Sequence, residues 1–249
     1  MDFVKMEGLG NDFVVIAGPY TPTTNEIAEW CDRRHGVGAD GVLVVTPLDD
    51  STVGMDYWNA DGSPAEMCGN GLRCVARYAV SYGLVDGPDF VVETAVGPRR
   101  VEVREGTVRA QLGVVNEAGN TVDLAGYRLD PMSVGNPHAV AFVDDCYAVP
   151  LAAAGPLIEG DPAFPERTNV EFATVAGAGR ILLRVWERGV GETLACGSGA
   201  AATVAAAYRR GLSGPRATVV LPGGSLDVEM IGDEAWIEGP AVEVFSGSR

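Results

Sequence analysis

The sequence predicts an α/β (α+β) fold of two pseudo-symmetric halves, each a curved, mostly antiparallel sheet wrapped around a central helix. Two observations lead to this prediction. A glycine-rich motif followed by an apolar helical stretch begins at Cys196, and a matching motif begins at Cys68, 128 positions earlier. Short valine-rich runs of strand length lie before and after both stretches. A long apolar helix is best buried when a sheet curls around it.

The second of the two helices has the clearer pattern. Residues 192–208 read ETLACGSGAAATVAAAY, so that Cys196 is followed by glycines and then by small apolar residues. A helix that is apolar on all sides is buried. The first N–H groups of a helix have no partner within it, and this end carries a partial positive charge. We therefore expect Cys196 to be shifted towards the thiolate, with an anion bound beside it.

The first half repeats this pattern in a constant register. The pairs at an offset of 128 positions are Trp58 and Trp186, Cys68 and Cys196, Gly69 and Gly197, Gly71 and Gly199, and Gly83 and Gly211. Further upstream, Gly10-Asn11 matches Gly135-Asn136 at nearly the same offset. A shared register from a tryptophan, through a thiol, to a glycine that can end the helix indicates two homologous halves.

The chain is expected to divide into residues 1–114, which carry Cys68, and residues 115–239, which carry Cys196. Residues 240–249 are expected to return to the first half as a strand. Strands are predicted at 13–17, 42–45, 55–59, 91–92, 101–103, 108–112, 139–143, 181–186, 218–221, 226–230, 235–237 and 242–245. Residues 25–34 are predicted to be helical, and residues 151–164 to be irregular with one short helix.

Composition excludes several classes of function. The net charge of −16 disfavours nucleic acid and anionic membranes as partners. No run approaches the ~20 apolar residues of a membrane-spanning helix, and the first residues do not resemble a signal peptide, so we expect a cytoplasmic protein. Five cysteines and two histidines, with no Cys-x-x-Cys, predict neither structural disulfides nor a metal site.

Two thiols at equivalent helix ends suggest a specific chemistry if they face each other across one cleft, as we expect from the repeat. One thiolate can remove a proton from a substrate carbon, and the opposite thiol can return one, which inverts the configuration. Sulfur suits this exchange because the ordinary thiol pKa of about 8.5 makes both protonation states accessible near neutrality. No cofactor is expected, because Lys5 is the only lysine available for a Schiff base.

The motifs of this chain resemble those of diaminopimelate epimerases, which are cofactor-independent, two-cysteine amino acid epimerases. The matching motifs are GLGNDFVV (8–15), RRHGVGADG (33–41), NADGS (59–63), MCGNGLRC (67–74), VGNPH (134–138), TNVEF (168–172) and ERGVGETLACGSGA (187–200). They occur in the family's order and extend over most of the chain. The chain is shorter than many family members, and we expect the missing residues in the region 143–164.

The resemblance implies roles for individual residues. Cys68 and Cys196 would be the two catalytic bases. The implied substrate-binding residues are Asn11, Asn59, Gly69, Asn70, Asn136, Asn169, Glu187, Arg188, Gly197 and Ser198. His138 and Glu187 would also tune the protonation of the thiols. The implied reaction interconverts LL- and meso-2,6-diaminopimelate in lysine biosynthesis, and the resemblance also implies a homodimer.

Other functions stay open at this stage. The nearest alternative is a related two-cysteine racemase acting on another amino acid, of the proline, hydroxyproline or histidine type. Asn59, Asn169 and Arg188 favour diaminopimelate, because they suit a substrate with a second amino acid head. A thiol–disulfide protein is disfavoured without Cys-x-x-Cys, and a non-catalytic binding module is a third possibility. Asp40 and Asp61 are expected to be turn or cap residues, and Cys31, Cys74 and Cys146 buried small hydrophobes.

Overall fold

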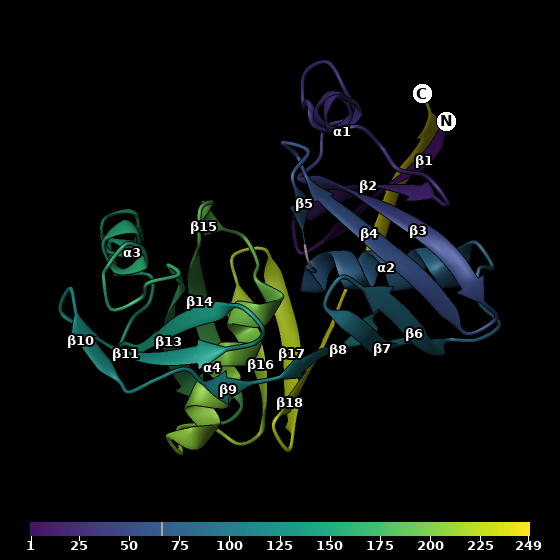
Figure 1. The fold of residues 1–249 in the computed structure, drawn as a ribbon. Helices are drawn as coiled ribbons and strands as arrows, with labels where there is room; N and C mark the ends of the chain where they lie inside the picture. Colours follow the sequence, from purple (N-terminus) through teal and green to yellow (C-terminus); the bar gives the residue numbers. More distant parts are fainter. Residues whose placement is uncertain (66) are drawn as a thin grey trace. The chain divides into compact units, whose positions relative to one another are not determined.

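The computed structural model describes residues 1–65 and 67–249, which form two compact units. Unit 1 consists of Met1–Ala110 together with Glu238–Arg249, and unit 2 of Gln111–Ile237. Each unit is a set of strands around one central helix, α2 in unit 1 and α4 in unit 2 (Figure 1). The predicted α/β fold class is therefore confirmed. No helix in the described part of the chain has the length and apolarity needed to cross a membrane.

In unit 1 most strand pairs are antiparallel. Its elements are β1 (Asp2–Gly8), β2 (Asn11–Ala17), α1 (Thr24–Cys31), β3 (Gly41–Asp49), β4 (Thr52–Asn59), β5 (Pro64–Ala65), α2 (Gly69–Ser81), β6 (Asp89–Thr94), β7 (Gly97–Val103) and β19 (Val242–Ser248), with β8 (Val108–Val114) at the boundary. The strands pair in the order β19-β1-β2-β3-β4-β6-β7-β8, of which only β2–β3 and β4–β6 are parallel.

Unit 2 repeats this plan. Its elements are β9 (Asn116–Glu117), β10 (Val122–Leu124), β11 (Tyr127–Ser133), β12 (Pro137–Phe142), α3 (Leu151–Glu159), β13 (Asn169–Gly177), β14 (Arg180–Glu187), β15 (Gly191–Thr193), α4 (Gly197–Arg209), β16 (Arg216–Leu221), β17 (Gly224–Ile231) and, at the boundary, β18 (Glu234–Gly239). The strands β11-β12-β13-β14-β16-β17 pair in this order, and β12–β13 and β14–β16 are the parallel pairs.

The repeat extends to the register of the strands. In the parallel pair of unit 1, Phe13 lies opposite Gly41; in that of unit 2, His138 lies opposite Asn169. These residues are related by the offsets of 125 and 128 positions that the sequence motifs showed. The short strand β5 pairs with the end of β4, and the short strand β15 pairs with the end of β14. In each unit the short strand lies in the chain between its partner strand and the central helix. The two units are therefore built from the same order of paired elements.

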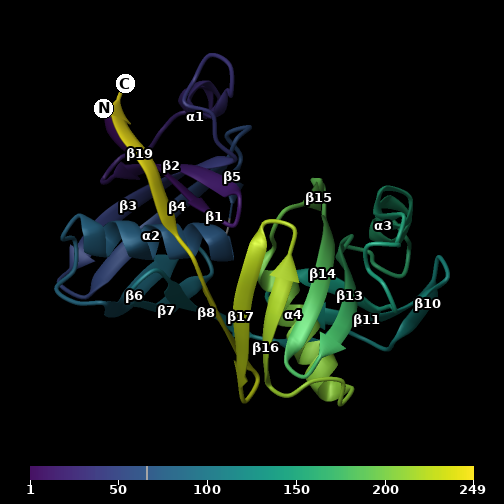
Figure 2. The same ribbon diagram turned by 180° about the vertical axis from the view of Figure 1, so that it is seen from behind.

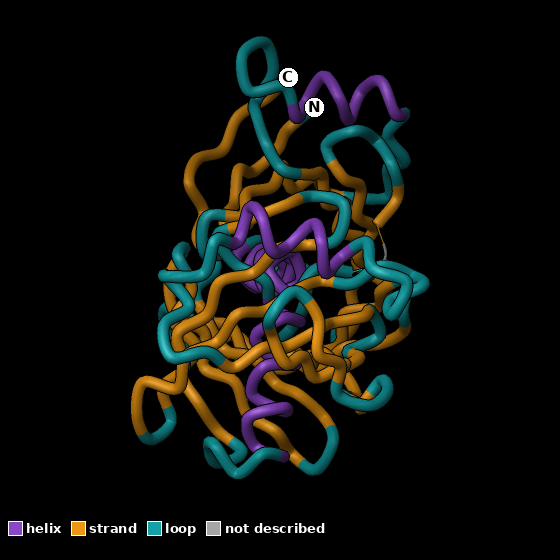
Figure 3. The backbone as a smooth tube through the Cα atoms, turned by 90° about the vertical axis from the view of Figure 1, so that its left-hand side faces the viewer, coloured by secondary structure: helices purple, strands orange, loops and turns teal. Residues whose placement is uncertain are grey.

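The two central helices form the middle of their units. Helix α2 contacts β1, β2, β3, β4, β6 and β7, whereas α4 contacts β11, β12, β13, β14, β16 and β17. All residues of α4 from Gly199 to Ala207 are buried, as expected for a helix that is apolar on all sides. Strands and loops make up most of the remaining backbone (Figure 3). Because the strands surround each helix, only its ends are positioned to present chemistry.

The chain termini lie together in unit 1. Strand β19 runs antiparallel to β1, and the backbone N–H of Arg249 donates to the carbonyl oxygen of Met1 at 2.9 Å (Figure 2). The sequence patterns did not predict β1, β11 or β13. Each contains a charged residue, respectively Lys5, Asp130 and Glu171. Two of these, Lys5 and Glu171, are buried in ion pairs or hydrogen bonds.

Candidate active-site residues around two cysteines

Cys68 and Cys196 occupy the same local position in their units. Each is the N-cap residue of its central helix, with φ and ψ of −132° and 128° at Cys68 and −129° and 111° at Cys196. Their carbonyl oxygens accept the first helical hydrogen bonds, from Leu72 at 2.8 Å and from Ala200 at 3.0 Å. The first turns therefore point their remaining N–H groups outward beside each sulfur, an arrangement that can bind a carboxylate.

Close packing explains the glycines of these first turns. A Cβ at Gly199 would lie 2.8 Å from Oε1 of Glu171 and 3.3 Å from Sγ of Cys196. A Cβ at Gly71 would lie 3.3 Å from the Met55 methyl group. A side chain at residue 199 would therefore push the helix away from the strand that carries Glu171. Gly69, Asn70 and Gly197 lie in the same turns and are buried, while Ser198 is half-buried.

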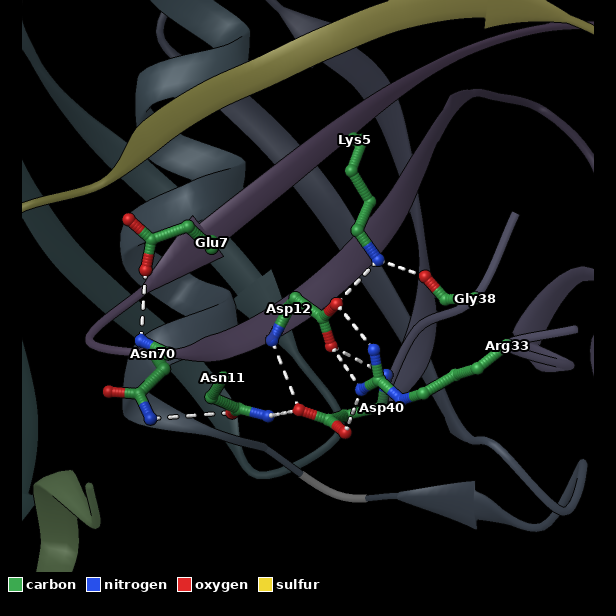
Figure 4. Close-up of polar contacts among 9 residues, drawn as sticks. Lys5, Glu7, Asn11, Asp12, Arg33, Gly38, Asp40 and Asn70 are labelled. Atoms are coloured by element: carbon green, nitrogen blue, oxygen red, sulfur yellow. Dashed lines mark hydrogen bonds and ion pairs between the residues drawn. The ribbon is translucent and has the colours of Figure 1, made fainter. Parts of the chain in front are cut away.

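The thiol of Cys68 faces a side-chain amide. Its Sγ donates to Oδ1 of Asn11 at 3.5 Å, and Nδ2 of Asn70 donates to the same oxygen at 3.3 Å. The other end of the Asn11 amide donates from Nδ2 to Oδ2 of Asp40 at 2.8 Å (Figure 4). The structure thus brings together Asn11, Cys68 and Asn70, three residues that the sequence motifs indicated, and adds Asp40.

An arginine lies buried next to this cluster. Arg73 has no exposed surface and donates to Oδ1 of Asn70 at 3.0 Å and to the carbonyl oxygens of Gly69 and Pro240 at 3.1 and 3.2 Å. Burial lowers the pKa of its guanidinium group. No sequence pattern indicated a role for Arg73. The sequence feature that could have indicated this arginine is a charged residue on the inward-facing side of a helix that is otherwise largely apolar there.

An ion-pair network lies on the far side of Asn11 (Figure 4). Asp12 pairs with the buried Lys5 at 2.6 Å and with Arg33 at 2.7 Å, and Arg33 also pairs with Asp40 at 2.7 Å. Burial by itself would raise the pKa of Asp12, but the hydrogen bonds from Arg33 and Lys5 overcome this and hold that pKa well below its usual range. Asp40, expected to be a turn residue, is therefore part of a charged network that reaches Asn11.

The thiol of Cys196 lies among hydrogen-bond donors. The N–H of Gly199 donates to Sγ at 3.4 Å, and Oγ of Ser198 lies 3.5 Å from it. Burial raises the pKa of Cys196 well above its usual value, and the carboxylates of Glu187 and Glu171 raise it further. The contacts from Ser198 and Gly199 act in the opposite direction. These two donors are therefore the groups that favour a thiolate at this position.

A buried histidine–glutamate pair lies close to Cys196. Nδ1 of His138 lies 2.7 Å from Oε1 of Glu171, and both side chains are buried completely. Nε2 of His138 lies 3.0 Å from Oδ1 of Asn136, whose Nδ2 donates to Oγ of Ser198 at 3.4 Å. The structure thus joins the predicted residues His138, Asn136 and Ser198 into one path to Cys196. Glu171 was part of a recognised motif, but no role was predicted for it.

The residues assigned to the distal end of the substrate are held by local contacts. Asn169 accepts from the backbone N–H of Arg188 at 2.9 Å and donates to the carbonyl oxygen of Pro137 at 2.8 Å. The Arg188 side chain is exposed and donates to the carbonyl oxygen of Glu166 at 3.0 Å. Asn59, in unit 1, donates to Oγ of Ser63 at 3.0 Å. Asn169 and Arg188 thus form one cluster in unit 2.

Glutamates fix the segment that carries Arg188. Glu159, at the end of α3, is 4% exposed and accepts from Nε1 of Trp186 at 2.7 Å and from the N–H of Gly189 at 2.6 Å. Its carboxylate also pairs with Arg167 at 2.5 Å. Glu187 accepts from Oγ1 of Thr193 at 2.5 Å. The residues on both sides of Glu187-Arg188 are therefore anchored to α3, a contact that no sequence pattern indicated.

The other cysteines are packed in the core. Burial raises the pKa of Cys31 to about 11 and that of Cys74 to about 12, and Cys146 is also completely buried. Within residues 1–65 and 67–249, no cluster of three or more His, Cys, Asp or Glu side chains is arranged to hold a metal ion. The described chemistry is therefore concentrated around the two N-cap cysteines.

Each of the two units, which share one plan, presents a cysteine at the N-terminus of its central helix. Solved structures with this fold include a hydroxyproline epimerase from Agrobacterium vitis (TM-score 0.72, 17% identity, covering 99% of this chain and 91% of that one). A predicted epimerase from Pseudomonas aeruginosa matches with a TM-score of 0.73 at 15% identity, covering 100% and 98% of the two chains.

Sequence comparisons identify the family. The model of the family described as diaminopimelate epimerase matches residues 3–118 and 132–245. The diaminopimelate epimerase of Pelotomaculum thermopropionicum is 44% identical over 99% of this chain and 98% of its own length. That of Synechococcus elongatus is 42% identical, over 100% and 98%. This chain belongs to the diaminopimelate epimerase family, as its motifs predicted.

Proposed function

We propose that this protein interconverts LL- and meso-2,6-diaminopimelate by inverting one Cα, with Cys68 and Cys196 as the two bases and without a cofactor. The observation that carries the proposal is the pair of N-cap cysteines at equivalent positions of a repeated fold. Membership of the family supports the choice of substrate. We further propose a role in lysine biosynthesis in the cytoplasm, as a homodimer, in line with the family resemblance.

The reaction needs no group beyond the two thiols. One cysteine, as the thiolate, takes the Cα proton and becomes a thiol, and the electron pair of the broken C–H bond stays on the substrate. The other cysteine, as the thiol, gives its proton to the opposite face of the same carbon and becomes a thiolate. The proton count is balanced, and the enzyme is left ready for the reverse reaction. The N–H groups of the two helix ends are suited to hold the α-carboxylate and to stabilise the charge that develops next to it.

Asn169 and Arg188 support a substrate with a second amino acid head. The guanidinium group can bind a carboxylate with two parallel hydrogen bonds. It is exposed, while its backbone is fixed by the bond from Arg188 N–H to Asn169. We propose that these residues, together with Asn59 and Glu187, bind the distal end of diaminopimelate. A proline-type substrate has no such group for them to bind.

The test is an assay of the purified protein with LL-diaminopimelate in D₂O and no added cofactor. We expect the meso form to appear and deuterium to enter Cα. Replacing either Cys68 or Cys196 by alanine should lower the rate by at least about 10²- to 10⁴-fold, the usual contribution of a general acid or base. Full activity in either variant would contradict the two-base mechanism. Inversion of proline or hydroxyproline, with none of diaminopimelate, would establish the alternative racemase function.

A further inference from the structure

We propose that Asp40 is a positioning residue that fixes the side-chain amide of Asn11 so that Cys68 is held as the thiol, the proton donor of the resting enzyme. This inference rests on the proposed function and adds to it an assignment of protonation states. It concerns contacts within unit 1 alone, among residues on β2, on the loop before β3 and at the start of α2.

The amide orientations are fixed because a hydrogen-bonded chain begins at a pure donor and ends at a pure acceptor. Arg73 donates to Oδ1 of Asn70 at 3.0 Å. Nδ2 of Asn70 donates to Oδ1 of Asn11 at 3.3 Å, and Nδ2 of Asn11 donates to the Asp40 carboxylate at 2.8 Å. A guanidinium group cannot accept and an ionised carboxylate cannot donate. If either amide were flipped, its NH₂ group would therefore face a donor and its oxygen would face an acceptor.

This orientation has a consequence for Cys68. The atom of Asn11 that lies 3.5 Å from Sγ is the oxygen, which can only accept a hydrogen bond. It therefore stabilises the S–H form and is repelled by a thiolate. The start of α2 and the Arg73 guanidinium favour the thiolate, so the Asn11 oxygen opposes both. The orientation of one amide thus influences which protonation state Cys68 adopts.

Asp40 is itself held from several directions. Arg33 donates to its Oδ1 at 2.7 Å, and the N–H of Asp12 donates to its Oδ2 at 3.1 Å. The N–H of Asp40 donates back to Oδ1 of Asp12 at 3.1 Å. The titratable groups around the path from Asp40 to Cys68 are Lys5, Glu7, Asp12, Arg33, Arg73 and Cys74. The carboxylate therefore stays in place to accept from Asn11.

Unit 2 provides an internal comparison. Thr168 stands at the position equivalent to Asp40, 128 residues later. The equivalent of Asn11 is Asn136, which is held by His138 and directs its Nδ2 towards Ser198 instead of presenting its oxygen there. The effect proposed for Asp40 should therefore be confined to Cys68.

The test compares the wild type with Asp40→Ala, which removes the carboxylate that accepts from Nδ2 of Asn11. The rate of alkylation by iodoacetamide is measured as a function of pH for each cysteine separately, by peptide mass spectrometry, without substrate. The rate follows the thiolate fraction. We expect Cys68 to react about tenfold faster at a fixed pH below its pKa, equivalent to a shift of about one pKa unit, and Cys196 to be unchanged.

Two further variants separate positioning from a structural effect. Asp49→Asn removes a carboxylate from an exposed turn of unit 1, where it binds Ser51, and should leave both rates unchanged. Asn11→Ala removes the oxygen next to Sγ and should also accelerate alkylation of Cys68. In the double variant with Asp40→Ala, the rate should match that of Asn11→Ala alone, because Asp40 acts through Asn11.

Specific outcomes would overturn the proposal. They are an unchanged Cys68 rate in Asp40→Ala, or an additional effect of Asp40→Ala in the Asn11→Ala background. If Asp40→Ala exposes the buried Cys31 and Cys74 to alkylation, the variant has lost its fold. The decision then rests on Asn11→Ala, where an unchanged Cys68 rate overturns the proposal. Because no substrate is used, a failure of this proposal can be distinguished from a failure of the proposed function in the diaminopimelate assay.

Discussion

The surroundings of the two cysteines differ although the backbones that carry them are alike. Behind Cys196 lie His138 and Glu171, buried and paired at 2.7 Å. The equivalent positions in unit 1, at offsets of 125 and 128 residues, are Phe13 and Leu43, both without exposed surface. One unit thus has two buried apolar side chains where the other has a titratable pair. The repeated fold supplies the helix end, while the residues behind it make each thiol chemically different.

The two equivalent asparagines show the same contrast. Asn11 presents its oxygen to Cys68, because Asp40 occupies its amide nitrogen. Asn136 directs its nitrogen to Ser198, because the ring nitrogen of His138 occupies its oxygen. One thiol therefore faces an acceptor, whereas the other faces the donors of residues 198 and 199. An epimerase needs one acid and one base at the start of each turnover, and this difference provides a means of assigning them.

The largest expected effect comes from making unit 2 resemble unit 1. Glu171→Leu leaves Nδ1 of His138 buried without its partner and should lower the free energy of unfolding by about 3 kcal/mol or more. The double variant His138→Phe/Glu171→Leu copies the pair found in unit 1 and should recover most of that loss, yet remain inactive on diaminopimelate. Urea unfolding and the epimerase assay measure the two effects. A double variant as unstable as Glu171→Leu would show that the units are packed differently at this point.

A smaller effect should follow from removing one donor at Cys196. Ser198→Ala takes away the hydroxyl that lies 3.5 Å from Sγ and opposes the rise of the Cys196 pKa. We expect alkylation of Cys196 to slow about tenfold at a fixed pH, as for the loss of a hydrogen bond to a charged group. Ser198→Thr keeps the hydroxyl and is the matched control. Equal rates in the alanine and threonine variants would show that the Ser198 hydroxyl does not affect Cys196. Slower alkylation of Cys68 would show that the effect of Ser198 is not confined to unit 2.

The smallest effect concerns the acid stability of unit 1. The pKa of Asp12 is lower in the folded protein than the ordinary value of 3.8, so its ion pairs stabilise the fold above that pH. The stabilisation is lost as the pH falls below about 4 towards the folded pKa. Arg33→Ala should cost about 0.5–1 kcal/mol at neutral pH, because Arg33 is half-exposed. Arg33→Ala should also make the free energy of unfolding fall less steeply as the pH drops below 4. Unfolding measured between pH 2 and pH 7 provides the check, and an unchanged acid slope would rule out this contribution.

Sequence patterns predicted the parts of this protein that depend on local chemistry. The Cys-Gly-x-Gly motifs indicated helix starts at residues 69 and 197, where α2 and α4 begin. The glycines at 71 and 199 reflect close contacts with neighbouring residues. The region 151–164, expected to be irregular with one short helix, contains the nine-residue helix α3. Gly155 and Pro156 lie inside this helix and weaken its sequence pattern.

What the sequence determined by itself is the repeat, the position of each thiol at a helix end and the family. These features follow from periodicity and from backbone groups left unpaired at a helix terminus, both of which act over a few residues. Only the tertiary structure decided which side chain orients each asparagine. Asp40 is 29 positions from Asn11, and Glu171 is 33 positions from His138. Such pairs depend on how strands align and pack, and no local spacing of residues encodes that register.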